Sequence, residues 1–179
     1  MPFLSLLLPL ALLGLGCGSK HTHRDPTGER FPSVVGTSLR GEEYRIPEAF
    51  AGEPVLLLVG YEQDTQFDLD RWLLGLTQAG IAVQAYELPT IPGLAPRMFK
   101  GTIDKGMRSG IPSEDWGAVI TVYGDGDKIA RFTGYENTLP GRVLLLDAEG
   151  RVIFFHDRGY SVGTLQRLRD ALERERKES

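Results

Sequence analysis

The chain has 179 residues, of which 41% are hydrophobic and 25% are charged, proportions that are ordinary for a globular protein. Its formal net charge is -4, and no run of Lys or Arg alternates with aromatic residues, so we expect no nucleic-acid partner. A single cysteine, Cys17, excludes an internal disulfide and a redox pair of cysteines.

The first 16 residues form an apolar leader without a charged side chain, and we interpret residues 1–16 as a signal peptide. The leader is shorter than the roughly 20 apolar residues that a spanning helix needs. Residues 13–19, LGLGCGS, resemble a bacterial lipoprotein signal, although Gly14 stands where such signals usually carry leucine. The resemblance implies cleavage before Cys17 and lipidation of its side chain. An ordinary secretory signal with an incidental cysteine is the alternative.

Residues 17–30 are polar, and we interpret them as a lipidated tether that precedes a single domain at 31–179. This arrangement predicts that the protein lies in the cell envelope, held by its lipid to a membrane on the non-cytoplasmic side. The sequence offers no pattern that predicts a metal site or a cofactor, and we expect neither.

The apolar run at residues 54–60, PVLLLVG, predicts a central strand that is covered on both faces. Five residues, 61–65, follow it, and then leucines and Trp72 recur at helical spacing until Gly80, where we expect the helix to stop. Thr65 is expected to cap the start of this helix, with Asp68 as the reciprocal partner.

The remaining elements follow from local patterns. Residues 43–47 predict an edge strand, and 81–88 predict a second inner strand that is parallel to the first. The other expected elements are a weak helix at 96–108, a third inner strand at 117–123, a helix or strand at 128–132, an antiparallel hairpin at 143–155, and a helix at 161–176 that buries Leu165, Leu168 and Leu172.

This order of elements resembles the thioredoxin fold with the extra N-terminal strand of its peroxiredoxin-like members. Residues 127–134 look like the short helix of that superfamily, and 144–152 look like its hairpin. The resemblance implies an α/β, thioredoxin-like fold: a central mixed sheet with a C-terminal hairpin and flanking helices. Shorter matches are similar to the mitochondrial ATP synthase assembly factors and their bacterial relatives, at Gly106-Met107-Arg108, Ile111-Pro112, Tyr135-Glu136-Asn137 and residues 141–147.

Redox members of the superfamily carry a reactive cysteine in the loop after the central strand, because the helix N-terminus lowers the pKa of a thiol there. Here that loop carries Tyr61, Glu62, Gln63 and Asp64 and no cysteine, and Arg142 stands where those proteins place a cis-proline. We therefore expect a redox-inactive domain that is not an enzyme. The four loop residues and Arg142 are expected to bind a protein partner, in the assembly of a membrane or envelope complex.

Three alternatives remain open at this point. The loop residues could serve only to close the loop and begin the helix. A cysteine-independent enzyme could use Glu62, Asp64, His156 and Asp157 as acids and bases. The protein could also be a structural envelope lipoprotein without a discrete site.

Overall fold

The computed structural model describes residues 21–93 and 100–178 of the chain. The predicted signal peptide at 1–16, the predicted lipidation site Cys17 and the predicted helix start near Pro96 lie outside these residues. Within the described ranges, no helix is both long enough and apolar enough to cross a membrane.

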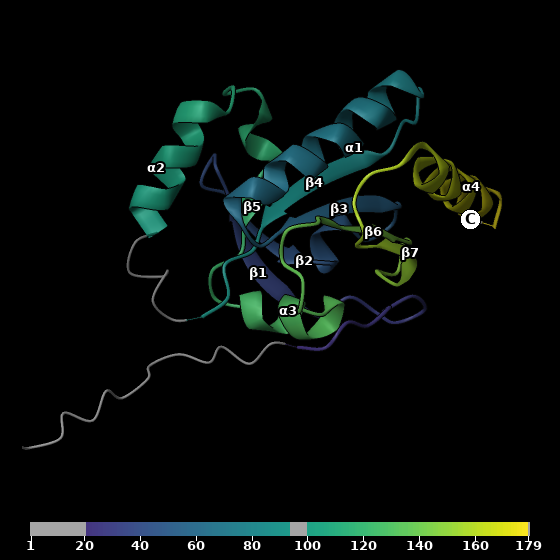
Figure 1. The fold of residues 1–179 in the computed structure, drawn as a ribbon, viewed down its shortest axis with the longest axis horizontal. Helices are drawn as coiled ribbons and strands as arrows, with labels where there is room; N and C mark the ends of the chain where they lie inside the picture. The colour runs from purple at the N-terminus through teal and green to yellow at the C-terminus, as the bar shows by residue number, and fades with distance from the viewer. Residues whose placement is uncertain (1–20, 94–99, 179) are drawn as a thin grey trace, which may run out of the picture.

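Strands and helices alternate along the chain, and Figure 1 shows them arranged around a twisted sheet. The strands are β1 Val34–Ser38, β2 Glu43–Ile46, β3 Val55–Gly60, β4 Gln84–Pro89, β5 Ile120–Thr121, β6 Arg142–Leu146 and β7 Val152–His156. The helices are α1 Gln66–Gln78, α2 Lys100–Gly110, α3 Gly126–Thr133 and α4 Val162–Glu178. The segment at 128–132, which the sequence left open, is therefore helical.

The central sheet is mixed, with the strand order β4-β3-β6-β7. β3 is parallel to β4 and antiparallel to β6, and β6 pairs with β7 as the predicted antiparallel hairpin. A second sheet has the order β2-β1-β5, and single parallel bridges join Glu87 to Val119 and Thr90 to Val122. The predicted central strand, the parallel crossover and the hairpin are confirmed.

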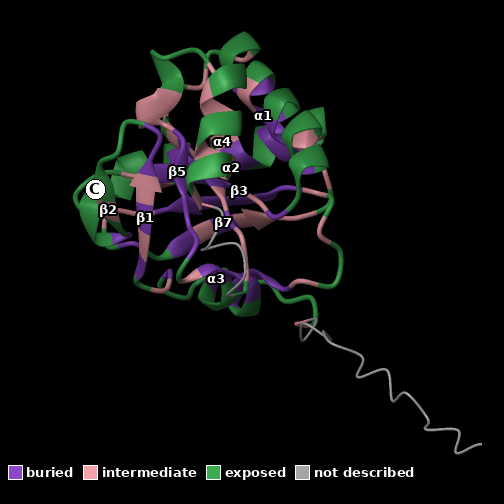
Figure 2. Ribbon diagram, turned by 90° about the vertical axis from the view of Figure 1, so that its left-hand side faces the viewer, coloured by how far each residue is buried: buried purple, intermediate pink, exposed green. Residues whose placement is uncertain are grey.

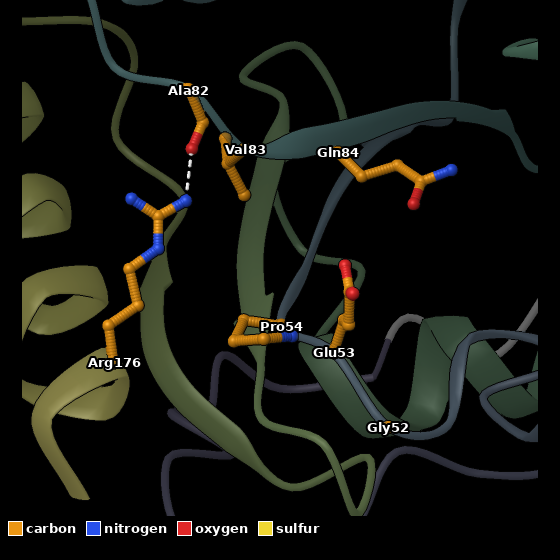
Figure 3. Close-up of a pocket in the computed structure, with 7 residues that line it drawn as sticks. All are labelled: Gly52, Glu53, Pro54, Ala82, Val83, Gln84 and Arg176. Carbon is orange, nitrogen blue, oxygen red and sulfur yellow. Dashed lines mark hydrogen bonds between the residues drawn. The ribbon is translucent and has the colours of Figure 1, made fainter. Parts of the chain in front are cut away.

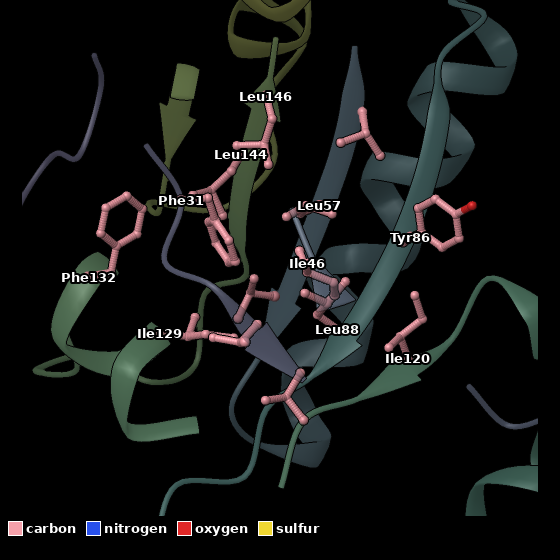
Figure 4. Packing of buried hydrophobic residues seen from close by; sticks show 14 of the residues in the cluster. Phe31, Ile46, Leu57, Tyr86, Leu88, Ile120, Ile129, Phe132, Leu144 and Leu146 are labelled. Atoms are coloured by element: carbon pink, nitrogen blue, oxygen red, sulfur yellow. The ribbon is translucent and has the colours of Figure 1, made fainter. Parts of the chain in front are cut away.

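The unbroken apolar run of β3 is explained by its two covered faces. Leu56 and Leu58 pack with the apolar sides of α1 and α4, in a cluster that includes Trp72, and the predicted Leu165, Leu168 and Leu172 are buried in it. Val55, Leu57 and Val59 face the other way, toward β1, β2 and α3. Figure 4 shows this second cluster, and Figure 2 shows that burial is concentrated in the strands and the inward sides of the helices.

The predicted third inner strand at 117–123 is present but shorter than expected. Only Ile120 and Thr121 form a strand, and they pair with β1, which the sequence did not predict. β1 approaches this strand closely at Gly36, where an added Cβ would lie 2.5 Å from Ile120 Cγ2 and 3.3 Å from the carbonyl oxygen of Thr121.

We expect Gly36→Ala to lower the free energy of unfolding by about 1–3 kcal/mol, because the added methyl group overpacks the space between β1 and β5. Gly101→Ala is the control, since nothing lies within 4 Å of the Cβ that it adds to α2. That variant should gain about 0.5–1 kcal/mol from the higher helix propensity of alanine. Urea denaturation of both variants checks the prediction, and a change of the same sign in their free energies of unfolding would contradict it.

The described part of the predicted tether, residues 21–30, lies against the domain. Gly28 N donates to Val152 O at 2.8 Å, Val152 N donates to Glu29 O at 2.9 Å, and Phe31 N donates to Gly150 O at 2.8 Å. These bonds place residues 28–31 beside the start of β7. Figure 1 shows the preceding residues passing close to α3.

Candidate functional site

The loop after β3 lies at the carboxyl end of the central strand, where α/β folds commonly bind ligands. It consists of Tyr61, Glu62 and a short 3₁₀-helix, Gln63–Thr65, that leads directly into α1. The side chains of Glu62, Gln63 and Asp64 are exposed, whereas Tyr61 and Thr65 are buried. The loop therefore presents two carboxylates and an amide to solvent, above the buried side chains of Tyr61 and Thr65.

The predicted cap of α1 by Thr65 and Asp68 is wrong. Thr65 has helical backbone angles and caps no N–H group of α1, because the 3₁₀-helix already continues into α1. Its hydroxyl donates instead to Thr138 O at 3.2 Å. The Asp68 carboxylate accepts hydrogen bonds from Gly141 N at 3.0 Å and Tyr160 N at 2.7 Å. Both side chains thus tie the start of α1 to distant segments of the chain.

Arg142 is the first residue of β6, beside Val59 of β3, and it is only 2% exposed. Its guanidinium donates to Pro140 O at 2.7 Å, to Gly134 O at 3.2 Å and to Asn137 O. We call residues 134–141, which connect α3 to β6, the 134–141 loop. One buried cation thus holds three carbonyl groups of this loop, and burial lowers the pKa of Arg142.

Tyr61 lies directly beneath this cation, with the Arg142 guanidinium carbon 5.0 Å from its ring centroid. Its hydroxyl is 2.7 Å from Thr133 Oγ1, and its ring meets Tyr135 edge-on at 4.9 Å. Burial raises the pKa of Tyr61 above its usual range, so the phenol stays protonated at neutral pH. Tyr61 and Arg142 therefore form the floor of the site, and only Glu62, Gln63 and Asp64 of the predicted set face outward.

Three further exposed side chains lie near these residues. Phe67, in the first turn of α1, is 70% exposed, and Leu139 of the 134–141 loop is 53% exposed. Glu136 of the same loop is also exposed. The helical spacing of the apolar residues could have identified Phe67, because it lies off the face that carries Leu69 and Trp72. We call the exposed set the strand-end face; it comprises Glu62, Gln63, Asp64, Phe67, Glu136 and Leu139.

Among the described residues, no hydrogen bond or ion pair joins any two of the acids and bases considered for a cysteine-independent enzyme. His156 Nε2 forms a hydrogen bond with Gly159 O at 2.8 Å, and the centroid of its ring lies 5.9 Å from that of Trp72. Asp157 pairs with His23 at 2.7 Å, and Glu62 accepts a hydrogen bond from the Thr138 hydroxyl. In the part of the chain that the structure describes, no group of three or more His, Cys, Asp or Glu could hold a metal ion.

Residues 21–24, which we call the docked segment, lie against the 134–141 loop. Tyr135 N donates to His21 O at 2.8 Å, and His23 N donates to a Glu136 carboxylate oxygen at 3.1 Å. The docked segment therefore reaches the edge of the strand-end face.

A hollow of about 600 Å³ lies at the opposite end of β3 and β4 (Figure 3). Its lining includes the polar side chains of Glu53, Gln84 and Arg176, and Arg176 reaches from α4 to the carbonyl oxygen of Ala82. None of the large, exposed hydrophobic side chains of the described residues lines this hollow, whereas Phe67 and Leu139 belong to the strand-end face. The strand-end face is therefore the stronger candidate site.

Glu87 of β4 lies beside the start of α1, where Gln66 Nε2 donates to its carboxylate at 2.9 Å. Burial raises the pKa of this carboxyl above its ordinary value of 4.5. The folded state therefore favours the protonated form, and stability is lost as the pH rises through the folded pKa.

We expect Glu87→Gln to be more stable than the wild type at pH 7, by less than about 1 kcal/mol, with the difference vanishing in acid. Urea titrations at pH 7 and pH 3.5 check this, and a less stable variant at pH 7 would contradict it.

Comparisons with known proteins agree on the architecture. No family model matches the chain, and no curated protein does. A thiol peroxidase from Chromobacterium violaceum has a TM-score of 0.59 and 13% identity, and the match covers 89% of this chain and 93% of that one. The thioredoxin domain of a thiol-disulfide oxidoreductase from Bacteroides vulgatus has a TM-score of 0.50 and 16% identity, with coverage of 87% of this chain and 98% of that one. The pneumococcal exposed lipoprotein thioredoxin from Streptococcus pneumoniae has a TM-score of 0.51 and 16% identity, with coverage of 83% of this chain and 100% of that one. The fold is thioredoxin-like. The predicted fold class is thereby confirmed.

The expectation that the chain is not an enzyme is overturned by these same comparisons. A thiol peroxidase and a thiol-disulfide oxidoreductase are enzymes, and both share the fold over most of this chain. A thioredoxin-like domain is thus a scaffold on which enzymes are built, and the absence of a cysteine from one loop was too narrow a ground for that expectation.

Proposed function

We propose that this chain is a membrane-tethered thioredoxin-like domain that binds a protein partner through the strand-end face, and that it serves the assembly of a membrane or envelope complex. The observation that carries this proposal is the contrast within the site. Exposed carboxylates and two exposed apolar side chains stand on a base that Arg142 and Asp68 fix by hydrogen bonds. Apolar anchors with a polar rim on a fixed backbone are typical of protein-binding surfaces.

Two further observations support this proposal. The loop after β3 carries no cysteine, so we propose that no thiol exchange takes place at this loop. The likeness of residues 13–19 to a lipoprotein signal supports a lipid tether at Cys17 in the cell envelope, on the non-cytoplasmic side. One structural neighbour is itself named an exposed lipoprotein thioredoxin, which gives a precedent for this combination.

The proposal is tested with a photo-crosslinking residue at Gln63 in intact cells. Gln78 is the matched control, because it is an exposed glutamine at the other end of α1. We expect one dominant partner from position 63 and none from position 78. Adding Asp64→Lys should reduce the capture about tenfold, since reversing the charge of an exposed interface residue disturbs charge complementarity and costs roughly 1–2 kcal/mol or more. The same mixture of abundant proteins from both positions, unchanged by Asp64→Lys, would refute the proposal.

A further inference from the structure

The docked segment fixes where the chain leaves the domain. Its contacts with the 134–141 loop are joined by two others: the His23 ring pairs with Asp157 at 2.7 Å, and the Arg24 guanidinium carbon lies 5.6 Å from the Phe132 ring centroid. The backbone also passes close to Gly134, where an added Cβ would lie 2.8 Å from the Thr22 carbonyl oxygen. Several independent contacts therefore hold His21 beside Tyr135.

We infer that the strand-end face is turned toward the membrane and that its partner is a basic segment with apolar side chains, which a membrane protein presents at the bilayer surface. This inference rests on the proposed function, because it takes Cys17 as the point of lipid attachment.

The orientation follows from the length of chain between the anchor and the docked segment. Cys17 precedes His21 by four residues. Four residues span at most about 14 Å even when fully extended. β3 alone, with six residues, separates the two ends of the domain by about 20 Å. A lipid at Cys17 therefore holds the end that carries Tyr135 near the bilayer and keeps the end that carries Glu53 away from it.

The partner's chemistry follows from the charges of the strand-end face. Its exposed charged groups are the carboxylates of Glu62, Asp64 and Glu136, and the exposed Arg71, one helical turn after Phe67, stands beside the exposed Asp70. The Arg142 cation is buried beneath the face, while the docked segment's Arg24 is paired with Glu29. An anionic bilayer surface repels such a face, whereas Lys and Arg side chains of a protein are attracted to it.

The exposed apolar side chains add a second requirement. Phe67 is 70% exposed and Leu139 is 53% exposed, and large apolar side chains that are buried on binding commonly supply much of the affinity of an interface. A segment that combines basic and apolar residues satisfies both features of the strand-end face. Such a segment must lie close to the bilayer, because the short connection to Cys17 keeps the face there.

The orientation is tested on the lipidated chain in phosphatidylcholine vesicles that contain nitroxide-labelled lipid. Cys17 is the one cysteine of the chain, so when lipid blocks its sulfur an introduced cysteine is the single free thiol. We compare a fluorophore at Gln63→Cys with one at Glu53→Cys, both exposed positions. We expect quenching to be at least threefold stronger at position 63. Equal quenching, or stronger quenching at position 53, would overturn the inferred orientation.

Mass spectrometry of the N-terminal peptide separates this inference from the proposed function. A chain without lipid on Cys17 refutes the tether itself. A lipidated chain with equal quenching at the two positions leaves the tether intact and refutes only the orientation.

The partner's chemistry is tested by locating the crosslinked peptide captured from position 63. We expect it to lie next to a membrane-spanning segment and to contain Lys or Arg, and a captured peptide from a protein without such a segment would overturn the inference. The unlipidated Cys17→Ser chain is also mixed with phosphatidylglycerol vesicles. We expect it to stay in solution. If it instead sediments with the vesicles, and Phe67→Ala abolishes this sedimentation, the face binds lipid and the inferred partner is overturned.

Discussion

Replacing Arg142 by alanine is expected to lower the free energy of unfolding by about 2–4 kcal/mol, because the substitution leaves one buried and two partly buried acceptors unpaired. The guanidinium now satisfies carbonyl groups of Gly134, Asn137 and Pro140. It also covers the ring of Tyr61. The removal of a buried cation recovers part of this cost, since its own desolvation is unfavourable. The net loss is therefore smaller than the sum of the separate interactions.

The same substitution is expected to speed hydrogen exchange of the backbone amides in the 134–141 loop by at least tenfold. Urea denaturation measures the loss in the free energy of global unfolding, and hydrogen exchange under native conditions measures local opening of the 134–141 loop. Arg142→Lys keeps the charge but lacks the planar guanidinium that reaches several carbonyls at once, so it should fall between the wild type and the alanine variant. Arg131→Ala, at an exposed position of α3, is the control and should change stability by less than about 0.5 kcal/mol. Unchanged exchange in the loop of Arg142→Ala would contradict the role given to the guanidinium.

Patterns within a short window predicted most of the fold. The apolar run of β3 indicated a strand covered on both faces, and Leu56 and Leu57 are indeed buried on opposite faces. The hairpin and α4 were predicted for the same reason, because periodicity is imposed by burial along one element. The length of β5 was misjudged because its regular pairing covers two residues of β1, a strand far away in the sequence, and so short a contact leaves no periodic pattern.

The sequence predicted a surface at Glu62, Gln63 and Asp64, but neither the burial of Tyr61 and Arg142 nor the three exposed side chains that complete the face, Phe67, Glu136 and Leu139. Glu62, Gln63 and Asp64 follow a strand, and position alone places them at its carboxyl end. The burial of Arg142 depends on carbonyl groups that the intervening loop brings back to it, and nothing in the residue types announces that geometry. The contacts of residues 21–24 were missed because a polar segment that hydrogen-bonds to the domain resembles a solvated linker in composition.

The Thr65 and Asp68 cap failed for a related reason. A capping box is a local motif, whereas the hydrogen-bond partners of Asp68 lie 73 and 92 residues further along the chain. Local and long-range partners compete for the same carboxylate, and the long-range partners prevail here because two N–H groups reach it together.

Asp68→Ala is expected to lower the free energy of unfolding by about 2–4 kcal/mol, because two partly buried N–H groups lose a charged acceptor. Asp68→Asn keeps one acceptor oxygen and should lose about half as much. Asp70→Ala is the matched control, since Asp70 is an exposed aspartate of the same helix, and its effect should stay within about 0.5 kcal/mol. Urea denaturation of the three variants gives the order, and an equal loss for Asp68→Ala and Asp70→Ala would contradict it.

The double variant Asp68→Ala with Arg142→Ala tests whether the two side chains hold the same loop. Asp68 accepts from Gly141 N, and Arg142 donates to the neighbouring Pro140 O, so the two act on adjacent peptide groups. Once either side chain is removed, the 134–141 loop is already loosened, and removal of the other has less order to destroy. We expect the double variant to be less destabilised than the sum of the single variants, by about 1 kcal/mol or more, as is usual for residues that share partners. Strict additivity would mean that each side chain stabilises its own region, and that the strand-end face does not rest on a jointly held loop.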